Sequence, residues 1–344
     1  MSIVVLQLPD VKRRSEGRPG KCPYCGGETF QRWGQVRKPV KDNRYRTVQV
    51  YRYRCCRCGR TFRHYPEGVS NADQTERMKK LAGICWMLGL SCRRAEQILG
   101  AFGVLLSFMS VWRDVQVDAQ QVVSRNHWRK VRVLGLDGAY VLGWGKIQPV
   151  LVAVDMGAGE VVALGYVDEY RPQAVQHFLE PLVQRLGVSV IVTDDLISYR
   201  QVAERLALGH QVCQFHVRRW VNKALKQLDK SLPKEWVWVL EVVKQIIDEL
   251  PQDGDKRLYA LWKQVGLRLD RRHSLRPVDR LRDLLIRLSQ QWSSYVTFYR
   301  EPEVPWTNNA TERAICRMKM RARTVRGYKN WPGMHNGLLL SATI

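Results

Sequence analysis

The sequence predicts a mixed α/β protein in which a core of strands and helices follows two smaller N-terminal domains. Three observations support this fold class. Two cysteine pairs flank an alternating strand pattern near the N-terminus, apolar residues recur at helical spacing between residues 71 and 118, and apolar strands alternate with amphipathic helices from residue 131 onward. A chain of 344 residues with 45% hydrophobic residues has room for two or three domains of about 150 residues, each with a buried core.

The composition points to a polyanionic partner. Lys and Arg together number 56 against 32 Asp and Glu, which gives a formal charge of +24. An excess of this size favours nucleic acid over a membrane surface. No run of about 20 apolar residues occurs, and the start, MSIVVLQLPDVKRR, lacks the features of a signal peptide. We therefore expect a cytoplasmic, nucleoid-associated protein.

Five of the nine cysteines lie between residues 22 and 58, which favours metal binding over disulfides in a cytoplasmic protein. The pairs Cys22-x-x-Cys25 and Cys55-x-x-Cys58 are each followed by a glycine. Two such turns, brought together by a hairpin, can hold one structural Zn²⁺ tetrahedrally. Cys56 is an alternative to Cys55, but only Cys55 keeps the two-residue gap to Cys58. We predict a zinc ribbon whose Arg and Lys residues contact phosphate.

Residues 71–118 contain three helical segments. Apolar residues are three or four positions apart in ADQTERMKKLAGICWMLG, a second short helix follows Gly89 with Ser91 as its N-cap, and a third, LLSFMSVWRDVQV, follows Gly103. Three short helices with a glycine-containing turn fit a helix-turn-helix domain, whose last helix enters a major groove of DNA. An ordinary three-helix linker domain is the alternative.

From residue 131 the pattern changes to strands. VRVLGLDGAYVLG is an apolar strand with Asp137 at its centre, and KIQPVLVAVDMGAGEVVALGYVDE is a hairpin of two apolar strands. An amphipathic helix, RPQAVQHFLEPLVQRLG, leads to the buried strand VSVIVTDD, which is followed by another helix and the short strand HQVCQF. Three antiparallel strands, a helix, a parallel strand and a further helix are the order of a ribonuclease H-like α/β domain.

Residues 217–305 contain no convincing strand and are predicted to form an all-helical insertion, with five tryptophans in its core: Trp220, Trp236, Trp238, Trp262 and Trp292. The predicted organisation is a zinc ribbon (1–69), a helix-turn-helix DNA-binding domain (70–125), the first part of the ribonuclease H-like core (126–216), the helical insertion (217–305) and the last part of the core (306–344).

Three separated acidic residues are candidates for a shared metal centre. A carboxylate inside an apolar strand needs a partner, and a divalent cation would serve Asp137. Asp194 ends a strand at the carboxyl edge of the sheet, where open α/β sheets bind ligands. The first and fourth strands of a ribonuclease H-like sheet are adjacent, so these two acids would meet, and Glu312 on a late helix would complete the cluster. Such ligands suit two Mg²⁺ or Mn²⁺ ions acting at a phosphorus centre.

Each acid also has a plainer interpretation. Glu312 follows the turn TNNA, where Asn308 or Asn309 would cap a helix and the carboxylate would face the positive end of the helix dipole. Asp195 is an alternative ligand to Asp194, or a cap for the next helix.

The remaining acids near the strands have other expected roles. The glycines after Asp155 indicate a turn, and Asp168 and Glu169 end a strand and are expected to be solvated.

The sequence resembles bacterial insertion-sequence transposases that carry an Asp-Asp-Glu catalytic triad and a helical insertion. The resemblance covers nearly the whole chain and rests on GLDGAYV, VIVTDDLISYRQVAE, CQFHVRRWV and TNNATERAI, together with the zinc ribbon. It implies that Asp137, Asp194 and Glu312 are the triad of an active enzyme, because no catalytic position is replaced. It also matches the family's Cys-x-x-His motif to Cys213 and His216.

The residues by themselves leave Cys213 and His216 open. They could begin a zinc site, but no second pair stands nearby in the sequence. His216 could instead contact the scissile phosphate, orient a catalytic acid, or be structural.

The helix after Glu312 carries many Arg and Lys residues and almost no acids. These positive charges would repel one another unless DNA neutralised them. A solvated basic face is the alternative. We predict a DNA-binding surface formed by Arg313, Arg317, Lys319, Arg321, Arg323 and Arg326, with Arg218 and Arg219 after the Cys-x-x-His motif.

The predicted function is therefore that of a DNA transposase. The ribbon and the helices would bind the ends of a mobile element, and water would expose a 3′-hydroxyl that then attacks target DNA in line. Holding two ends of double-stranded DNA would require a homodimer or a larger assembly. The alternatives are a DNA-binding regulator derived from a transposase and a structure-selective nuclease of the same fold, which would cut without joining.

Overall fold

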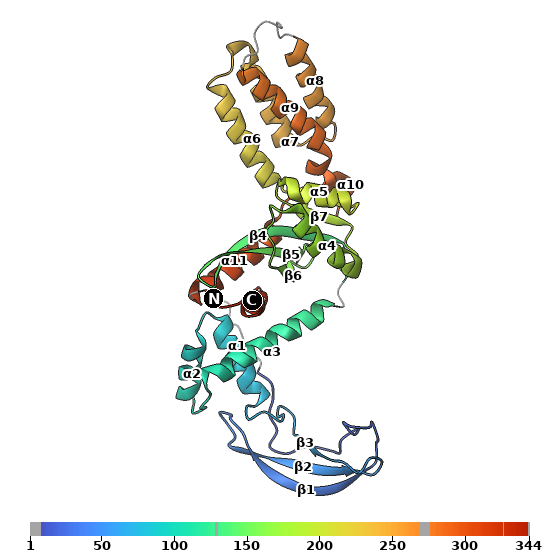
Figure 1. Ribbon diagram of the computed structural model, residues 1–344, viewed down its shortest axis with the longest axis vertical. Coiled ribbons are helices and arrows are strands. Elements are labelled where there is room, and N and C mark those ends of the chain that lie inside the picture. The colour runs from blue at the N-terminus through green and yellow to red at the C-terminus, as the bar shows by residue number, and fades with distance from the viewer. Residues whose placement is uncertain (1–7, 128–129, 268–275, 326, 343–344) are drawn as a thin grey trace. The chain divides into compact units, whose positions relative to one another are not determined.

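A computed structural model of the chain describes residues 8–127, 130–267, 276–325 and 327–342. The chain forms two compact units, one made mainly of the residues up to Val122 and the other mainly of the chain from Val123 onward. Figure 1 shows the elements of both units. Over the described ranges, no helix is both long and apolar enough to cross a membrane.

The first unit begins with a three-stranded antiparallel sheet of β1 (Phe30–Pro39), β2 (Thr47–Cys55) and β3 (Thr61–His64), with β2 in the centre. The alternation predicted for β2 is present at its start, where Val48 and Val50 are buried. They pack in a small cluster with Val11, Val40 and Val69. So small an apolar core stabilises a domain only weakly. A bound metal would supply additional stability.

Three helices follow, as predicted: α1 (Glu76–Met87), α2 (Cys92–Ala101) and α3 (Phe108–His127). The side chain of Thr75 accepts the N–H of Met78 at the start of α1, and the predicted cap Ser91 accepts the N–H of Arg94 at the start of α2. The third helix begins at Phe108, later than predicted, because the hydroxyl of Ser107 accepts the N–H of Ser110 and caps the helix there. The cluster between the helices contains Met78, Ala82, Ala95, Leu99 and Val111.

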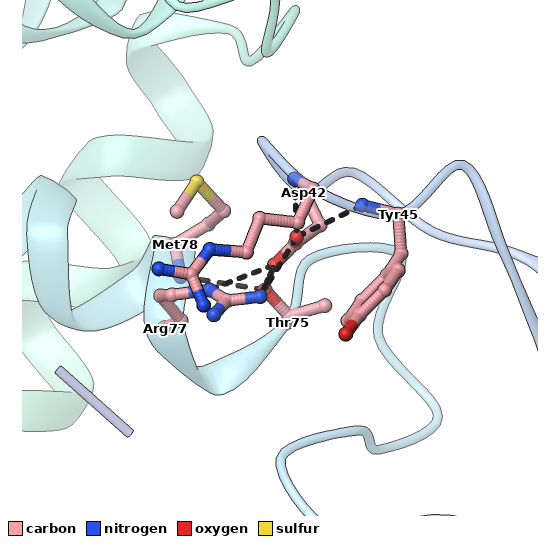
Figure 2. A network of polar contacts seen from close by, with 6 residues as sticks. Asp42, Tyr45, Thr75, Arg77 and Met78 are labelled. Atoms are coloured by element: carbon pink, nitrogen blue, oxygen red, sulfur yellow. Dashed lines mark hydrogen bonds and ion pairs between the residues drawn. The ribbon is translucent and has the colours of Figure 1, made fainter. Parts of the chain in front are cut away.

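A buried ion pair joins the β1–β2 loop to α1 (Figure 2). Arg77 Nη2 lies 3.0 Å from Asp42 Oδ1, and the two side chains are 5% and 0% exposed. The hydroxyl of Thr75 donates to Asp42 Oδ2, and the backbone N–H groups of Arg44 and Tyr45 donate to Oδ1. Burial opposes ionisation, but these hydrogen bonds together hold the pKa of Asp42 below its ordinary value. Removal of one partner would leave an uncompensated buried charge, at a cost of about 3–5 kcal/mol.

The second unit is built on a five-stranded sheet in the order β6-β5-β4-β7-β8. Strands β4 (Val133–Gly143), β5 (Lys146–Asp155) and β6 (Glu160–Gly165) form an antiparallel meander, and β7 (Val190–Thr193) and β8 (Gly209–Val212) run parallel to β4. Helices α4 (Pro172–Leu186) and α5 (Ile197–Arg205) connect the parallel strands. The first and fourth strands are therefore neighbours, as predicted.

The two faces of β4 pack against different elements, because side chains alternate along a strand. Leu134 and Leu136 belong to the cluster that contains the apolar residues of α4 and α5. Val133 belongs to a second cluster with Val190, Val192 and Val304. Helix α11 (Asn309–Thr324) approaches that second face, where Thr311 lies against Gly135. The last helix, α12 (Trp331–Ser341), contacts β6.

The described part of residues 217–305 is helical, as predicted. It comprises most of α6 (Gln214–Asp229), a 3-10 turn (Lys234–Trp236), α7 (Val237–Glu249), α8 (Gly254–Leu267), α9 (Arg276–Tyr295) and α10 (Thr297–Arg300), which share one apolar core. Trp236 and Trp292 are buried in this core, and Trp220 and Trp262 pack against it. The prediction for Trp238 was wrong: it is 37% exposed, because a position two residues after the buried Trp236 turns to the opposite side of α7.

Candidate active site

The four predicted cysteine ligands form one cluster in the ribbon. Cys22 Sγ lies 3.8 Å from Cys58 Sγ, Cys25 Sγ lies 3.6 Å from Cys55 Sγ, and all four sulfurs are within 4.8 Å of one another. Sulfurs at the corners of a tetrahedron around Zn²⁺ are about 3.8 Å apart. The cluster is therefore compatible with a zinc site.

The glycines after each cysteine pair make the turns. Gly26 and Gly59 have φ angles of 70° and 71°, in the left-handed region that favours glycine, and each donates its N–H to the carbonyl of the first cysteine of its pair. Cys56, the alternative ligand, is exposed and lies outside the cluster.

The carboxylates of Asp137 and Asp194 come together in the second unit, with Glu169 as a third member of the group. The register of β4 and β7, continued two residues past the Gly135–Val192 pair, sets Asp137 opposite Asp194. One oxygen of each of the three acids lies within 4.8 Å of the others. Asp137 Oδ1 accepts the N–H of Gly138 at 2.8 Å, whereas Asp194 Oδ1 is buried and has no hydrogen-bond donor among the described residues.

The electrostatics of this group oppose the ionisation of Asp137 and Asp194. Burial, and then the charge of Glu169, raise the pKa of Asp137 to about 6. Burial, and then the charge of Asp137, raise the pKa of Asp194 to about 7. His216 opposes both shifts. A divalent cation would favour the ionised forms and so reverse the effect.

The expectation of a solvated Glu169 was wrong. Its side chain is buried, with 6% of the residue exposed, in the segment between β6 and α4. The hydroxyl of Tyr199 on α5 donates to Oε2 at 2.7 Å, and that of Tyr140 on β4 donates to Oε1 at 3.2 Å. The side chain of Asp168 next to it is 37% exposed and pairs with Arg171. No local signal separates these two acids, because the burial of Glu169 comes from residues on other elements.

Asp194 and Asp195 have different partners. Asp195 pairs with Arg200 Nη2 at 2.8 Å and with Arg287 Nη2 at 2.7 Å, and its side chain is 6% exposed. These ion pairs occupy Asp195 and leave Asp194 in the acidic group. Asp155 makes the predicted turn, since its Oδ1 accepts the N–H groups of Gly157 and Ala158.

Glu312 lies in the first turn of α11, and His216 in the first turn of α6. His216 Nε2 donates to Glu312 Oε1 at 3.1 Å, with the two side chains 36% and 41% exposed. Together with the buried Cys213 they form a second group of possible ligand atoms within 4.8 Å of one another. Glu312 is thus grouped with His216 rather than with the two aspartates, but its charge contributes to the raised pKa of Asp137.

Asn308 connects the start of α11 to β4 and to the start of α6 through hydrogen bonds. Its side-chain Nδ2 donates to the carbonyl of Leu136 in β4 at 3.1 Å, next to Asp137. Its backbone N–H donates to Cys213 Sγ at 3.3 Å, at the start of α6. The side-chain amide group is therefore used to connect α11 with β4. Cys213, for which the sequence suggested no definite role, contacts the same turn.

The predicted basic residues differ in exposure. Arg313, Arg323 and Arg219 are exposed, and Arg317, Lys319 and Arg218 are half-buried. Arg321 is 4% exposed, which contradicts its place on a surface, because it continues the buried stripe of Ala314 and Met318 along α11. Arg326 lies outside the described residues. The guanidinium of Arg218 stands over the half-exposed ring of Trp306, 5.9 Å from its centroid.

Comparison with known proteins identifies the family. Residues 150–336, more than half of the chain, match the sequence profile of the IS66 family of transposases, and the match includes Asp194, His216 and Glu312. The chain is also 21% identical, over 301 residues, to the insertion element ISM1 uncharacterized 48.3 kDa protein of Methanobrevibacter smithii, an alignment that covers 85% of this chain and 74% of that protein. The predicted resemblance to insertion-sequence transposases is confirmed, and this chain belongs to the IS66 family of transposases.

Proposed function

We propose that this protein is a DNA transposase that cuts and joins DNA with Asp137, Asp194 and Glu312 as its catalytic triad. One observation carries the proposal: Asp137 on β4 lies close to Asp194, which directly follows the adjacent parallel strand β7, and a buried oxygen of Asp194 has no donor in the described part of the chain. An antiparallel meander followed by two parallel strands on the other side of β4 supports a ribonuclease H-like core. Membership of a transposase family supports an enzymatic role.

The acidic groups fit a divalent metal with oxygen ligands, Mg²⁺ or Mn²⁺. No ion pair joins Asp137 or Asp194 to Lys or Arg within the described ranges, so a cation is the partner that these carboxylates lack. Asp137, Asp194 and Glu312 would hold the ions. When bound, two such ions would activate the attacking water or hydroxyl and stabilise the charge on the leaving oxygen at phosphorus.

His216 would orient Glu312. The 3.1 Å hydrogen bond holds the carboxylate of Glu312 in one direction, and a hydrogen-bonded partner of this kind is typical of a metal-binding carboxylate. Asn308 and Cys213 support the same arrangement, because they connect the start of α11 to β4 and α6. This supports the orienting role of His216 over a purely structural one.

DNA would be bound by the first unit and by basic residues near the triad. The four-cysteine cluster would hold one structural Zn²⁺, and α1–α3 would act as the helix-turn-helix reader of the element ends. Arg313, Arg219 and Arg218 would contact phosphate near the acidic groups. Cutting and joining two ends would require a homodimer or a larger assembly on DNA.

Cleavage of DNA that carries the element's own ends tests the proposal. We would compare the wild type with Glu312→Gln and with the matched surface variant Glu241→Gln, in Mg²⁺ and in EDTA. Wild type and Glu241→Gln should leave metal-dependent 3′-hydroxyl ends that are then joined to target DNA. Glu312→Gln should bind the ends normally but cleave at least about a hundredfold more slowly.

Three other results would each overturn part of the proposal. Undiminished cleavage by Glu312→Gln would remove Glu312 from the triad. Tight binding without cleavage by the wild type would favour a DNA-binding regulator. Cleavage without strand joining would favour a nuclease.

A further inference from the structure

Glu169 is the acid of the second unit that the proposed triad leaves unexplained. It lies between β6 and α4, and one of its oxygens is within 4.8 Å of ligand atoms of both Asp137 and Asp194. It is the most buried of these three acids, with 6% of the residue exposed. A carboxylate in this position is costly unless something compensates for its burial.

The fold holds the Glu169 carboxylate from three sides. Tyr199 donates to Oε2 and Tyr140 donates to Oε1, so each oxygen has one hydroxyl donor. The third side is the backbone of Gly138, the residue after Asp137. A Cβ at position 138 would lie 2.1 Å from Glu169 Oε1, so only glycine admits the carboxylate so close to β4. The Glu169 carboxylate therefore has a fixed direction and lies in close contact with β4, the strand that carries Asp137.

The charge around this group is not balanced by the protein. The donors to Glu169 are neutral hydroxyls, and no Lys or Arg forms an ion pair with Asp137, Glu169 or Asp194 in the described part of the chain. The contrast with the adjacent Asp195 is informative, because two arginines pair with it. The buried Asp194 Oδ1, without any donor among the described residues, lies in the same group. An acidic group whose buried member is held by two hydroxyls, and which has no counter-charge among the described residues, is suited to a bound cation.

We propose that Glu169 is a further carboxylate ligand of the metal centre, binding the ion held by Asp137 and Asp194. This inference rests on the proposed function, since it assigns a fourth acid to the same centre. Tyr199 and Tyr140 act as positioning residues that aim the Glu169 carboxylate at the ion. Glu312 on α11, which is hydrogen-bonded to His216 on α6, then completes the centre from the second group of possible ligand atoms. The protein would supply four acids in place of three.

Mn²⁺ binding by the full-length chain, measured by calorimetry at pH 7.5 without DNA, tests this assignment separately from catalysis. Glu169→Gln keeps the size of the side chain and one oxygen that can accept a tyrosine hydroxyl, but removes the charge. We expect Glu169→Gln to weaken Mn²⁺ binding at least about tenfold, because even the loss of a group that only orients a metal ligand costs about 10–100-fold. Glu180→Gln removes an exposed carboxylate from α4 and should bind Mn²⁺ like the wild type.

Asp194→Asn separates the inference from the proposal on which it rests. If Asp194→Asn loses Mn²⁺ binding while a folded Glu169→Gln retains wild-type affinity, Glu169 is not a ligand and the triad stands. If Asp194→Asn also binds Mn²⁺ like the wild type, the proposed metal centre itself is wrong.

Tyr199→Phe keeps the test decisive if Glu169→Gln fails to fold. It retains the buried ring and removes only the donor that aims Oε2. We expect it to weaken Mn²⁺ binding severalfold while the variant remains folded. Wild-type Mn²⁺ affinity in a folded Tyr199→Phe, together with wild-type affinity in Gly138→Ala, whose Cβ would displace the carboxylate, would overturn the inference.

Discussion

Asp194 and Asp195 follow the same strand, yet among the described residues only Asp195 forms ion pairs with arginine. Arg200 from α5 and Arg287 from α9 pair with Asp195, whereas Asp194 faces two other acids and has a raised pKa, about 7. Burial raises the pKa of both aspartates, but the two arginines oppose the shift at Asp195, whereas the neighbouring acids add to it at Asp194. Removal of Asp195 would leave its arginine partners without a counter-charge, whereas removal of the charge of Asp194 would relieve repulsion.

This difference predicts opposite effects for two similar substitutions. Asp195→Asn should lower the free energy of unfolding by about 1–3 kcal/mol, because Arg200 and Arg287 lose their partner, and should leave cleavage within about tenfold of the wild type. Asp194→Asn should leave the metal-free protein as stable as the wild type or more stable, because it removes repulsion, and should abolish cleavage. Urea unfolding in EDTA, followed by tryptophan fluorescence, and end cleavage in Mg²⁺ measure the two effects. A stable Asp195→Asn without cleavage would transfer the ligand role to Asp195.

His210 predicts a loss of stability in acid. It is buried in β8, where Thr193 Oγ1 lies 2.9 Å from Nε2, and burial lowers its pKa to about 3 from 6.5. Below pH 6.5 the unfolded chain therefore binds a proton that the folded chain does not, so this residue reduces stability as the pH falls from 6.5 toward 3. Between pH 7.5 and pH 5 the loss is about 2 kcal/mol.

His210→Gln, which cannot take up that proton, isolates the effect. Urea titration measures its free energy of unfolding against that of the wild type. Relative to the wild type, this free energy should rise by about 2 kcal/mol when the pH falls from 7.5 to 5. The other titrating groups are common to both proteins and cancel in the difference. A difference that does not change with pH would show that His210 is not the acid-sensitive group.

At the scale of elements, β4 organises the site through two glycines as well as through Asp137. Gly138 makes room for the carboxylate of Glu169, and Gly135 makes room for the start of α11. A Cβ at position 135 would lie 2.2 Å from Thr311 Oγ1 and 2.4 Å from Met156 Sδ. The two glycines of the motif GLDGAYV, which flank Asp137, thus let the start of α11 and the loop that carries Glu169 lie close to β4.

Gly135→Ala should therefore move α11 and, with it, Glu312. We expect a loss of stability of about 1–3 kcal/mol from overpacking and a loss of cleavage of about a hundredfold, because a displacement of about 1 Å is enough to disturb a catalytic geometry. Gly20→Ala, where an added Cβ meets no atom within 4 Å, is the matched control for both measurements. Full activity in Gly135→Ala would mean that the position of α11 against β4 does not set that of Glu312.

At the scale of the whole molecule, the net charge of +24 predicts DNA binding that depends strongly on salt. If the protein contacts about 6–10 phosphates, its affinity for duplex DNA should fall by about 10³–10⁵-fold between 50 and 200 mM salt. Fluorescence anisotropy with a labelled element end, titrated at several salt concentrations, measures the slope. Arg313→Gln should reduce that slope by about one unit, whereas the buried Arg321 should not contribute to it. A shallow slope for the wild type would contradict the proposed phosphate contacts.

Local patterns in the sequence predicted most of the elements. The cysteine spacing, the alternation in β2, the apolar run of β4, the cap Ser91 of α2 and the helical insertion depend on residues a few positions apart, and each is present in the structure. Asp137 was recognisable because a charged residue interrupts an apolar strand. Asp194 was recognisable because it ends one.

The sequence by itself therefore determined the order of elements, the zinc-compatible cysteines and two of the acids that face one another. Only the tertiary structure decided that Glu169 is buried, that Asp195 is paired by Arg287, that Glu312 meets His216, and that Arg321 lies inside. The physical reason is distance along the chain. Secondary structure and turns follow from neighbouring residues, whereas the burial and pairing of a charge depend on which distant elements the sheet topology brings beside it.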